Sequence, residues 1–286
     1  MPTTLTPTTE HIAPQHPARR LLRNPLAIFS IVVLTVIVLA AIIGPMRVPY
    51  TVSTGGLNEP PSGAHWLGTD DSGYDILSRI GIGARVSLGI AISAEIVIVA
   101  FGCFVGLLAG YYGGKADTAL MRFTDMMFAF PDILLAILVA VILRGGLANI
   151  FVALAVTGWP GIARLVRGQT LSLRRREFIE AERALGVPDG QIMLRHVLPN
   201  LISAVVVAST VDIAGLVVAE STLSFLGIGV QPPLVSWGSL ISNARQYLGI
   251  HPELTYYPAL FLMLTVLALN FLGDALRDAL DPRSAG

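Results

Sequence analysis

Six stretches of this 286-residue chain are long and apolar enough to cross a lipid bilayer. A hydrocarbon core of about 30 Å requires roughly 20 consecutive apolar residues in a helix, and a helix satisfies its own backbone N–H and C=O groups within lipid. The sequence therefore predicts an all-α polytopic membrane protein with six transmembrane helices. These predicted helices are Leu26–Met46, Val86–Tyr112, Met126–Leu143, Gly145–Ala163, Val197–Leu226 and Leu254–Gly273.

The composition favours a membrane protein over a soluble one. Hydrophobic residues make up 53% of the chain and charged residues only 13%, whereas soluble domains carry about 25% charged residues. Helices of a soluble core are the alternative, but they are usually shorter and have a polar face. A signal peptide is the alternative for the first stretch. The apolar core of a signal peptide, however, spans only about 7–15 residues, which is shorter than this stretch. We therefore interpret Leu26–Met46 as a retained helix.

The distribution of basic residues predicts the orientation in the membrane. With a cytoplasmic N-terminus and six crossings, 14 of the 19 Lys and Arg residues fall in cytoplasmic segments and 5 fall in outer segments. Basic residues are enriched in cytoplasmic loops, so both termini are predicted to be cytoplasmic. The basic residues nearest the two ends are Arg19, Arg20 and Arg23 before the first helix, and Arg277 and Arg283 after the last.

Residue counts and spacing exclude several kinds of functional site. The 19 acidic residues balance the 19 basic ones, which is unlike a nucleic-acid-binding protein, and the lone Cys103 cannot form an intrachain disulfide. The only lysine, Lys115, does not lie in a nucleotide-binding loop, because Ala109 and Ala116 replace its glycine and its Ser or Thr. The H-E-x-x-H and G-x-S-x-G protease patterns are also absent. The sequence thus predicts no catalytic residue, no metal site and no cofactor held by the chain itself.

One large charged loop, Arg164–His196, lies between the fourth and fifth predicted helices, on the predicted cytoplasmic side. Its residues 171–186 predict an amphipathic helix, and Gly186 suits the left-handed position that ends a helix. Pro188 suits the first turn of a second short helix, which we expect to run to Pro199. A basic loop that only touches anionic lipid is the alternative. The rigid helix-turn-helix pattern favours a docking element for a cytoplasmic partner.

Within this loop, E-A-E-x-x-x-G from Glu180 to Gly186, followed by Leu198 and Pro199, resembles the EAA loop of bacterial ABC importer permeases. The resemblance covers nearly the whole chain from about residue 20 and points to the C-type subunit of the oligopeptide/dipeptide/nickel permease family. Glu182 departs from the loop motif, which usually has alanine there, and Tyr74 departs from the outer motif, which usually has arginine. The other matching motifs are GAHWLGTDDSGYDILSRI, GARVSL, GYYGG, AESTLSFLGIGVQPPLVSWGSL and GDALRDALDPR.

The resemblance implies a type I ABC importer permease fold in a bacterial or archaeal cytoplasmic membrane. Such a subunit forms half of a channel beside a homologous B-type permease, and two cytoplasmic ATPases, which bind ATP and Mg²⁺, power it. An extracytoplasmic binding protein delivers di- or oligopeptides, with nickel or another small solute as the alternative cargo. A stand-alone secondary transporter, driven by an ion gradient, is the alternative from another class.

The same resemblance implies which residues couple the chain to an ATPase. In such permeases a coupling helix lies in a cleft of the ATPase subunit, and here it would contain Glu180, Ala181 and Gly186. The remaining residues of the motif belong to the same loop. The expected coupling residues are Glu180, Ala181, Leu185, Gly186, Leu198 and Pro199.

Three carboxyl groups inside the predicted membrane helices are candidates for the transport pathway. Ionisable groups within membrane spans cost about 2.5–3.5 kcal/mol each on insertion scales and usually face a cavity. Asp212, Glu220 and Glu95 could line the pore and neutralise a cationic cargo or the amino terminus of a peptide. Alternatively, they bond to neighbouring helices or to the partner subunit. Asp132 lies nearer a membrane boundary.

These observations predict four parts of the chain. Residues 1–18 form a disordered cytoplasmic tail, and 19–85 contain the first helix and an outer segment that could cap the pathway, with Trp66 and Tyr74 packed on the outer surface. The permease core is 86–276, with the coupling loop at 170–199, and 277–286 form a cytoplasmic tail. Within the core, Val230–Trp237 predicts a rigid outer turn followed by a short interfacial helix.

Overall fold

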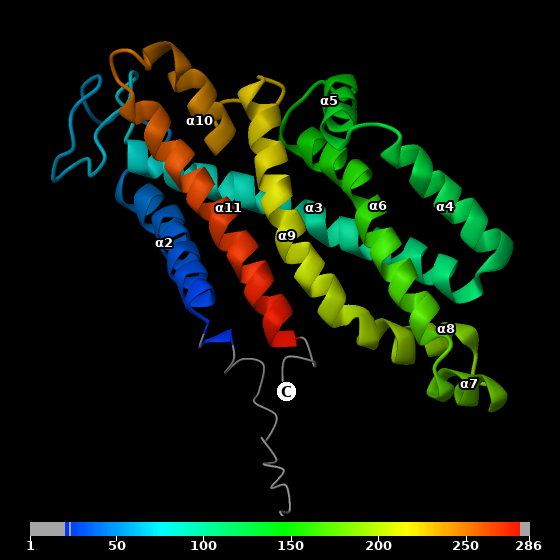
Figure 1. The fold of residues 1–286 in the computed structure, drawn as a ribbon. Coiled ribbons are helices and arrows are strands. Elements are labelled where there is room, and N and C mark those ends of the chain that lie inside the picture. Colours follow the sequence, from blue (N-terminus) through cyan, green and yellow to red (C-terminus); the bar gives the residue numbers. More distant parts are fainter. Residues whose placement is uncertain (1–20, 23, 281–286) are drawn as a thin grey trace, which may run out of the picture.

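The computed structural model describes residues 21–22 and 24–280, and the regular elements within these ranges are all helices (Figure 1). The predicted tail 1–18 lies outside the described residues, as do the end of the predicted tail 277–286 beyond residue 280 and the basic residues Arg19, Arg20, Arg23 and Arg283. The five long helices are α2 (Pro25–Arg47), α3 (Ile76–Tyr112), α6 (Leu147–Leu173), α9 (Leu198–Phe225) and α11 (Glu253–Leu280).

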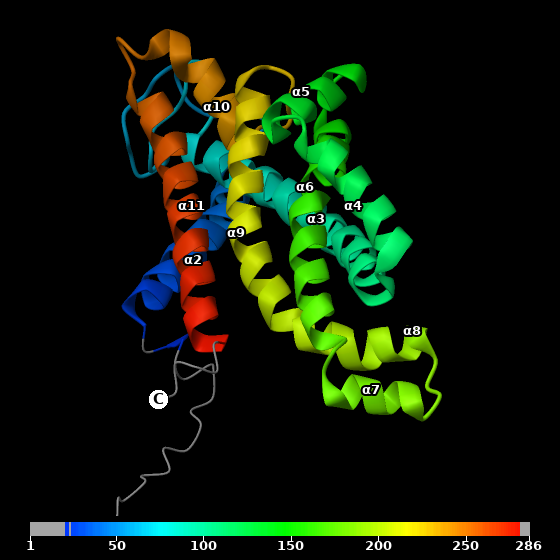
Figure 2. The same ribbon diagram turned by 45° about the vertical axis from the view of Figure 1, so that its right-hand side comes forward.

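The long helices form a bundle in which α3 is central. It packs against α2, α6 and α9, while α11 packs against α2 and α9. The start of α2 and the end of α11 lie at one end of the bundle, the end predicted to be cytoplasmic (Figures 1 and 2). The shorter helices are α4 (Gly114–Phe128), α5 (Asp132–Ile142), α7 (Glu177–Ala184), α8 (Asp189–Ile192), the π-helix η1 (Met193–Val197), α10 (Trp237–Ala244) and the 3₁₀-helix η2 (Arg245–Tyr247).

The predicted all-helical membrane fold is confirmed, with one change in its third helix. Within the described residues, five helices are long and apolar enough to span a membrane, or six if α4 and α5 together count as one. The single helix predicted over Met126–Leu143 is broken in the structure, because α5 begins at Asp132 and meets α4 at an angle of 84°. Pro131 explains the break, since proline disfavours a helical residue before it and cannot donate a backbone hydrogen bond.

The second membrane helix begins earlier than predicted, at Ile76 instead of Val86. The Asp75 carboxylate caps the helix by accepting a hydrogen bond from the backbone N–H of Ser78 at 2.8 Å. Because they contain Arg79 and Arg85, residues 76–85 were predicted to belong to the outer segment, but both side chains are bonded to other parts of the chain. Arg79 forms an ion pair with Asp70, and Arg85 Nε donates to the carbonyl of Ala41 at 2.7 Å.

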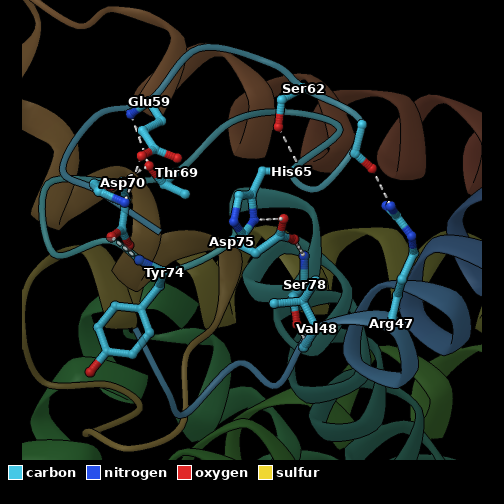
Figure 3. A network of polar contacts seen from close by, with 12 residues as sticks. Arg47, Val48, Glu59, Ser62, His65, Thr69, Asp70, Tyr74, Asp75 and Ser78 are labelled. Atoms are coloured by element: carbon cyan, nitrogen blue, oxygen red, sulfur yellow. Dashed lines mark hydrogen bonds and ion pairs between the residues drawn. The ribbon is translucent and has the colours of Figure 1, made fainter. Parts of the chain in front are cut away.

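Residues 48–75, which we call the outer cap, fold over the start of α3 (Figure 3). His65 Nδ1 lies 2.9 Å from Asp75 Oδ2, and both side chains are buried. The Ser78 hydroxyl donates to the carbonyl of Val48 at 2.6 Å, which joins the end of α2 to the start of α3. The cap is therefore fastened to α3 through the same carboxylate that begins the helix.

Two aromatic side chains of the outer cap each contact an arginine guanidinium. The Arg47 guanidinium lies 4.3 Å from the centre of the Trp66 ring, which is half exposed, and the Arg79 guanidinium lies 4.9 Å from the Tyr74 ring. At these separations, an arginine is attracted to the face of an aromatic ring. Tyr74, which departs from the motif of the resembling family, is thus a packing partner of Arg79.

The predicted turn and short helix near Val230–Trp237 are present as α10 and the segment before it, while their outer, interfacial position stays a prediction. Ser236 and Ser239 cap α10 reciprocally. Trp237 is fully buried, and its indole N–H donates to the carbonyl of Ile80 on α3 at 3.2 Å. The turn thus brings α10 back onto the bundle.

Helices α3 and α6 pack closely along a row of glycines. A methyl group added at Gly106 would lie 2.5 Å from the carbonyl oxygen of Ala163, and one added at Gly110 would lie 2.6 Å from the Thr170 Cβ. Gly102 faces Ile162 in the same way. Glycines spaced four residues apart allow two membrane helices to approach closely, which explains why the backbones of α3 and α6 nearly touch.

Candidate functional site

The loop between α6 and α9 projects from one end of the bundle as two short helices, α7 and α8 (Figure 2). The predicted helix-turn-helix is therefore present, but the single helix predicted over 171–186 is wrong. Helix α6 ends at Leu173 and α7 begins at Glu177. The Arg174 side chain donates to the carbonyls of Gly110 and Tyr111 at the end of α3, each at 3.2 Å. These carbonyls lack helical partners, so a tertiary contact ends α6 where local propensity would extend it.

Gly186 takes the left-handed conformation that the sequence predicts, with φ +77°. Its N–H donates to the carbonyl of Arg183 at 3.0 Å, and the N–H of Val187 donates to the carbonyl of Glu182 at 3.1 Å. These two bonds satisfy carbonyls at the end of α7 and turn the chain toward Pro188, which precedes α8. The direction of α7 relative to α8 therefore depends on this one backbone conformation.

The second helix of the loop does not end at Pro199, where a boundary was predicted. Residues 189–225 form one continuous helical run through the π-helix η1. Pro199 has no N–H to donate to the preceding turn, and in η1 the N–H of Leu198 donates to the carbonyl of Met193, five residues earlier. The wider turn accommodates the proline without breaking the helix, so α8 is rigidly continuous with the membrane helix α9.

The loop has a buried face and an exposed face. Ile179, Ile192 and Val197 are fully buried and hold the loop against the bundle. Of the predicted coupling residues, Leu185 is 81% exposed and Leu198 is half buried. Those that are also exposed, and thus free to contact another protein, are Glu180, Ala181, Gly186 and Pro199. Their contact with an ATPase stays a prediction.

Tyr111 joins the loop to the end of α3. Its hydroxyl donates to Asp189 Oδ1 on α8 at 2.7 Å and accepts from Arg183 Nε on α7 at 3.2 Å. The Arg183 guanidinium also lies over the Tyr111 ring, 4.6 Å from its centre. Sequence reasoning missed this cluster, because Tyr111 looked like the ordinary aromatic end of a membrane helix. A tyrosine beside Gly113 and Gly114 was the only signal.

Glu182, the other departure from the family motif, lies between the two helices of the loop. Its Oε1 is 3.5 Å from Nε2 of His196 in η1, and both side chains are about one-third exposed. An exposed pair of this kind contributes little stability. Glu182 thus connects α7 to η1 and does not disturb the exposed face.

We predict that Tyr111→Phe loosens the coupling loop without unfolding the bundle. The ring still packs, but Asp189 and Arg183 lose their shared hydrogen-bond partner, which is worth about 1.5–3 kcal/mol for bonds to charged groups before solvent screening. Protease cleavage within residues 174–190 should become faster, while the melting temperature of the whole chain changes little. Tyr112→Phe, at the exposed neighbouring residue, is the matched control and should behave like the unchanged protein. Equal cleavage of the two variants would contradict the role of Tyr111.

A second candidate site is a cavity of about 440 Å³ between α3, α5, α6 and α9. Glu95 and Asp212, two of the three predicted pathway carboxyls, line it, together with Asp132. The rest of the lining is mainly apolar and includes Ile98, Leu154 and Leu216. The fold therefore brings together carboxylates from α3 and α9 that are far apart in the sequence.

Glu220, the third predicted pathway carboxyl, lies apart from this cavity. It is fully buried and accepts hydrogen bonds from the Ser87 hydroxyl of α3 at 2.6 Å and from the Ser224 hydroxyl at 2.7 Å. The backbone N–H of Trp237 also donates to the Ser87 hydroxyl, at 3.4 Å. These contacts correspond to the alternative in which Glu220 bonds to a neighbouring helix.

Two family descriptions match the chain. Residues 102–286 match "Binding-protein-dependent transport system inner membrane component". Residues 16–61 match "N-terminal TM domain of oligopeptide transport permease C". The two matches together span the first helix and all of the bundle after residue 101, and leave 62–101 between them.

Curated relatives are similar over most of their length. The glutathione transport system permease protein GsiD of Pectobacterium atrosepticum is 44% identical over 269 residues, which cover 93% of this chain and 89% of the relative. The oligopeptide transport system permease protein OppC of Haemophilus influenzae is 40% identical over 274 residues, which cover 94% of this chain and 88% of the relative.

Among solved structures, the inward-facing MetNI methionine ABC transporter is similar, with a TM-score of 0.58 and 23% sequence identity. The likeness covers 71% of this chain and 97% of the matched chain. At this identity it shows a shared fold, which is that of type I importer permeases.

Proposed function

Because the chain belongs to the family of binding-protein-dependent inner membrane permeases of ABC importers, as a C-type subunit, we propose that it imports di- or oligopeptides across a bacterial or archaeal cytoplasmic membrane. It forms half of a channel, and a homologous B-type permease forms the other half. Two ATPase subunits bind the cytoplasmic end, and an extracytoplasmic binding protein delivers the cargo.

The geometry of the coupling loop is the main support for this proposal. Helix α7 presents Glu180 and Ala181 to the solvent, and Leu185 at its C-terminal end is exposed as well. An exposed apolar side chain beside a small residue and a carboxylate suits a cleft in a partner protein with a basic rim. Since α8 continues into α9, movement of the docked loop is transmitted directly to a membrane helix.

The energy for transport comes from the partners, because the chain lacks a nucleotide-binding loop of its own. Its single lysine, Lys115, lies in the first turn of α4, and an alanine replaces each of two required motif residues. We therefore assign ATP and Mg²⁺ to the ATPase subunits. Closure of these subunits would push the coupling loops and change the side of the membrane to which the pathway opens.

The names of the relatives favour a peptide as cargo. One relative is named for oligopeptides and another for glutathione, which is a tripeptide. Both names point to a small, flexible, charged molecule rather than to a metal ion. Nickel or another small solute is the alternative cargo for the same architecture.

The function is tested by reconstituting the chain with a B-type permease, two ATPases and the binding protein in proteoliposomes. Trialanine, glutathione and Ni²⁺ serve as separate probes. We expect uptake of at least one of the peptides only when both ATP and the loaded binding protein are present, and no uptake of Ni²⁺ above background. Omitting ATP or the binding protein is the control for each probe.

Two outcomes would overturn parts of this proposal. Uptake driven by an ion gradient without the ATPases would identify a secondary transporter. ATP-driven uptake of Ni²⁺ but of neither peptide would replace the peptide cargo with a metal ion.

A further inference from the structure

The cavity between α3, α5, α6 and α9 has an unbalanced charge. Its lining includes the carboxyl groups of Glu95, Asp132 and Asp212, and the described residues that line it include no lysine, arginine or histidine. Glu95 comes from α3 and Asp212 from α9, so the two carboxyl groups reach the cavity from different helices. Asp132 is exposed at the first turn of α5. A concave surface lined by one sign of charge and by low-dielectric walls attracts the opposite charge.

Glu95 is the least satisfied polar group of this cavity. Its side chain is 4% exposed, yet neither carboxylate oxygen has a hydrogen-bond partner among the described residues. The buried hydroxyl of Ser209, one turn before Asp212, lies beside Glu95 and has a single O–H donor, so it can serve only one of the two carboxylate oxygens. Burying a carboxylate without a partner is costly, especially within a membrane span. A ligand with hydrogen-bond donors would satisfy these groups.

The contrast with Glu220 shows that the fold can satisfy a structural carboxylate. Glu220 is just as deeply buried, but serine hydroxyls donate to both of its oxygens. Among the described residues Glu95 has only the Ser209 hydroxyl beside it, although it lies on the same helix as Ser87, which serves Glu220. The empty hydrogen-bonding positions of Glu95 are therefore specific to the cavity.

We propose that this cavity binds a protonated primary amine, with Glu95 and Asp212 as its two carboxylate ligands. An ammonium group has three N–H donors and an ionised carboxylate has only acceptors, so the two are complementary. The mainly apolar walls suit an amine attached to a carbon chain better than a hydrated inorganic ion. The inference rests on the proposed function, because the amine would be the α-amino group of a transported peptide.

The charge of the cavity can be measured with a single cysteine. Gly215 lines the cavity one turn after Asp212, and a Cβ added there meets no atom within 4 Å. Gly215→Cys is introduced together with Cys103→Ala, which removes the native cysteine. The thiolate then reacts with a cationic or an anionic alkyl methanethiosulfonate, which forms a mixed disulfide and releases methanesulfinate. The matched control is Gly249→Cys, in an outer turn where an added Cβ also meets no atom within 4 Å.

Labelling is carried out in membranes that contain the full chain and its partner subunits. At Gly215→Cys we expect the ratio of cationic to anionic labelling rates to exceed that at Gly249→Cys by about ten-fold. Adding Glu95→Gln or Asp212→Asn should each lower this ratio toward the control value. Since the two substitutions are tested separately, a folding defect in one leaves the other as a test. A ratio equal to the control in the unchanged cavity would overturn the proposal.

Protection from labelling tests the ligand class. Trialanine should slow cationic labelling of Gly215→Cys, whereas N-acetyl-trialanine, which lacks the charged amine, should not. Glu95→Gln should abolish this difference, and Glu95→Asp should partly preserve it. Equal protection by the two peptides, or protection by neither, would refute an amine site. Labelling requires neither ATP hydrolysis nor transport, so this test can fail while ATP-driven uptake persists, and the reverse also holds.

Discussion

Gly186→Pro is expected to reduce ATP-driven uptake by at least about ten-fold while the chain remains in the membrane. Gly186 has φ +77°, whereas proline fixes φ near −65°. Proline also removes the N–H that donates to the carbonyl of Arg183, and it disfavours the helical conformation of Leu185 before it. Such a backbone conflict costs about 3 kcal/mol or more. The end of α7 would have to change direction, so its exposed residues would no longer meet the ATPase together.

The matched control is Gly186→Asn, because asparagine tolerates the left-handed conformation better than other side chains. No atom lies within 4 Å of a Cβ added at this position, so the side chain has room. We expect Gly186→Asn to keep most of the uptake and most of the ATPase activity stimulated by the binding protein. Both activities are measured in the same proteoliposomes. If Gly186→Pro retained them too, the turn would not determine docking.

Gly106→Leu is expected to prevent α3 and α6 from packing, and so to remove most of the folded protein from the membrane. Even a methyl group at this position would lie 2.5 Å from the carbonyl oxygen of Ala163 and 2.8 Å from the Val166 Cβ. Both obstacles belong to the helix backbone or to a stiff β-branched side chain, so neither can move aside. Overpacking costs about 1–3 kcal/mol in ordinary cores and more where backbones touch. The yield of monodisperse protein in detergent and its melting temperature measure the effect.

Gly89→Leu provides the comparison on the same helix. Gly89 is exposed and a Cβ added there meets no atom within 4 Å, so the leucine has room on the surface of the helix. We expect a yield and a melting temperature close to those of the unchanged chain. A similar loss in both variants would show that helix composition, and not contact with α6, makes glycine necessary at Gly106.

The membrane helices could be predicted because a long apolar run is a local property of the sequence. The points at which helices end or break depend on distant residues, and most of them could not be predicted. Long apolar runs near Leu26–Met46 and Leu254–Gly273 identify membrane helices without any knowledge of neighbours. The end of α6 at Leu173 depends on Arg174 reaching carbonyls of Gly110 and Tyr111, more than 60 residues away in the sequence. No periodicity within the loop reveals such a contact. The bend between α4 and α5 was accessible in principle, because Pro131 marks it.

The residues of the candidate sites were likewise predictable only in part. Gly186 was predictable, since glycine after an amphipathic helix indicates a left-handed turn. The three membrane carboxyls were also visible in the sequence, but their separation into a cavity pair and a structural group was not. That separation depends on Ser87 and Ser224 donating to both oxygens of Glu220. Within the described part of the chain, neither oxygen of Glu95 accepts a hydrogen bond. Only the three-dimensional packing of α3 against α9 distinguishes the two environments.

Helix α3 is an unbroken strut between the two surfaces of the protein. Its 37 residues contain no proline, and at 1.5 Å per residue they extend about 55 Å. At one end Asp75 ties it to His65 of the outer cap, and at the other end Tyr111 ties it to α7 and α8. One continuous helix therefore joins the outer cap to the loop that carries α7 and α8.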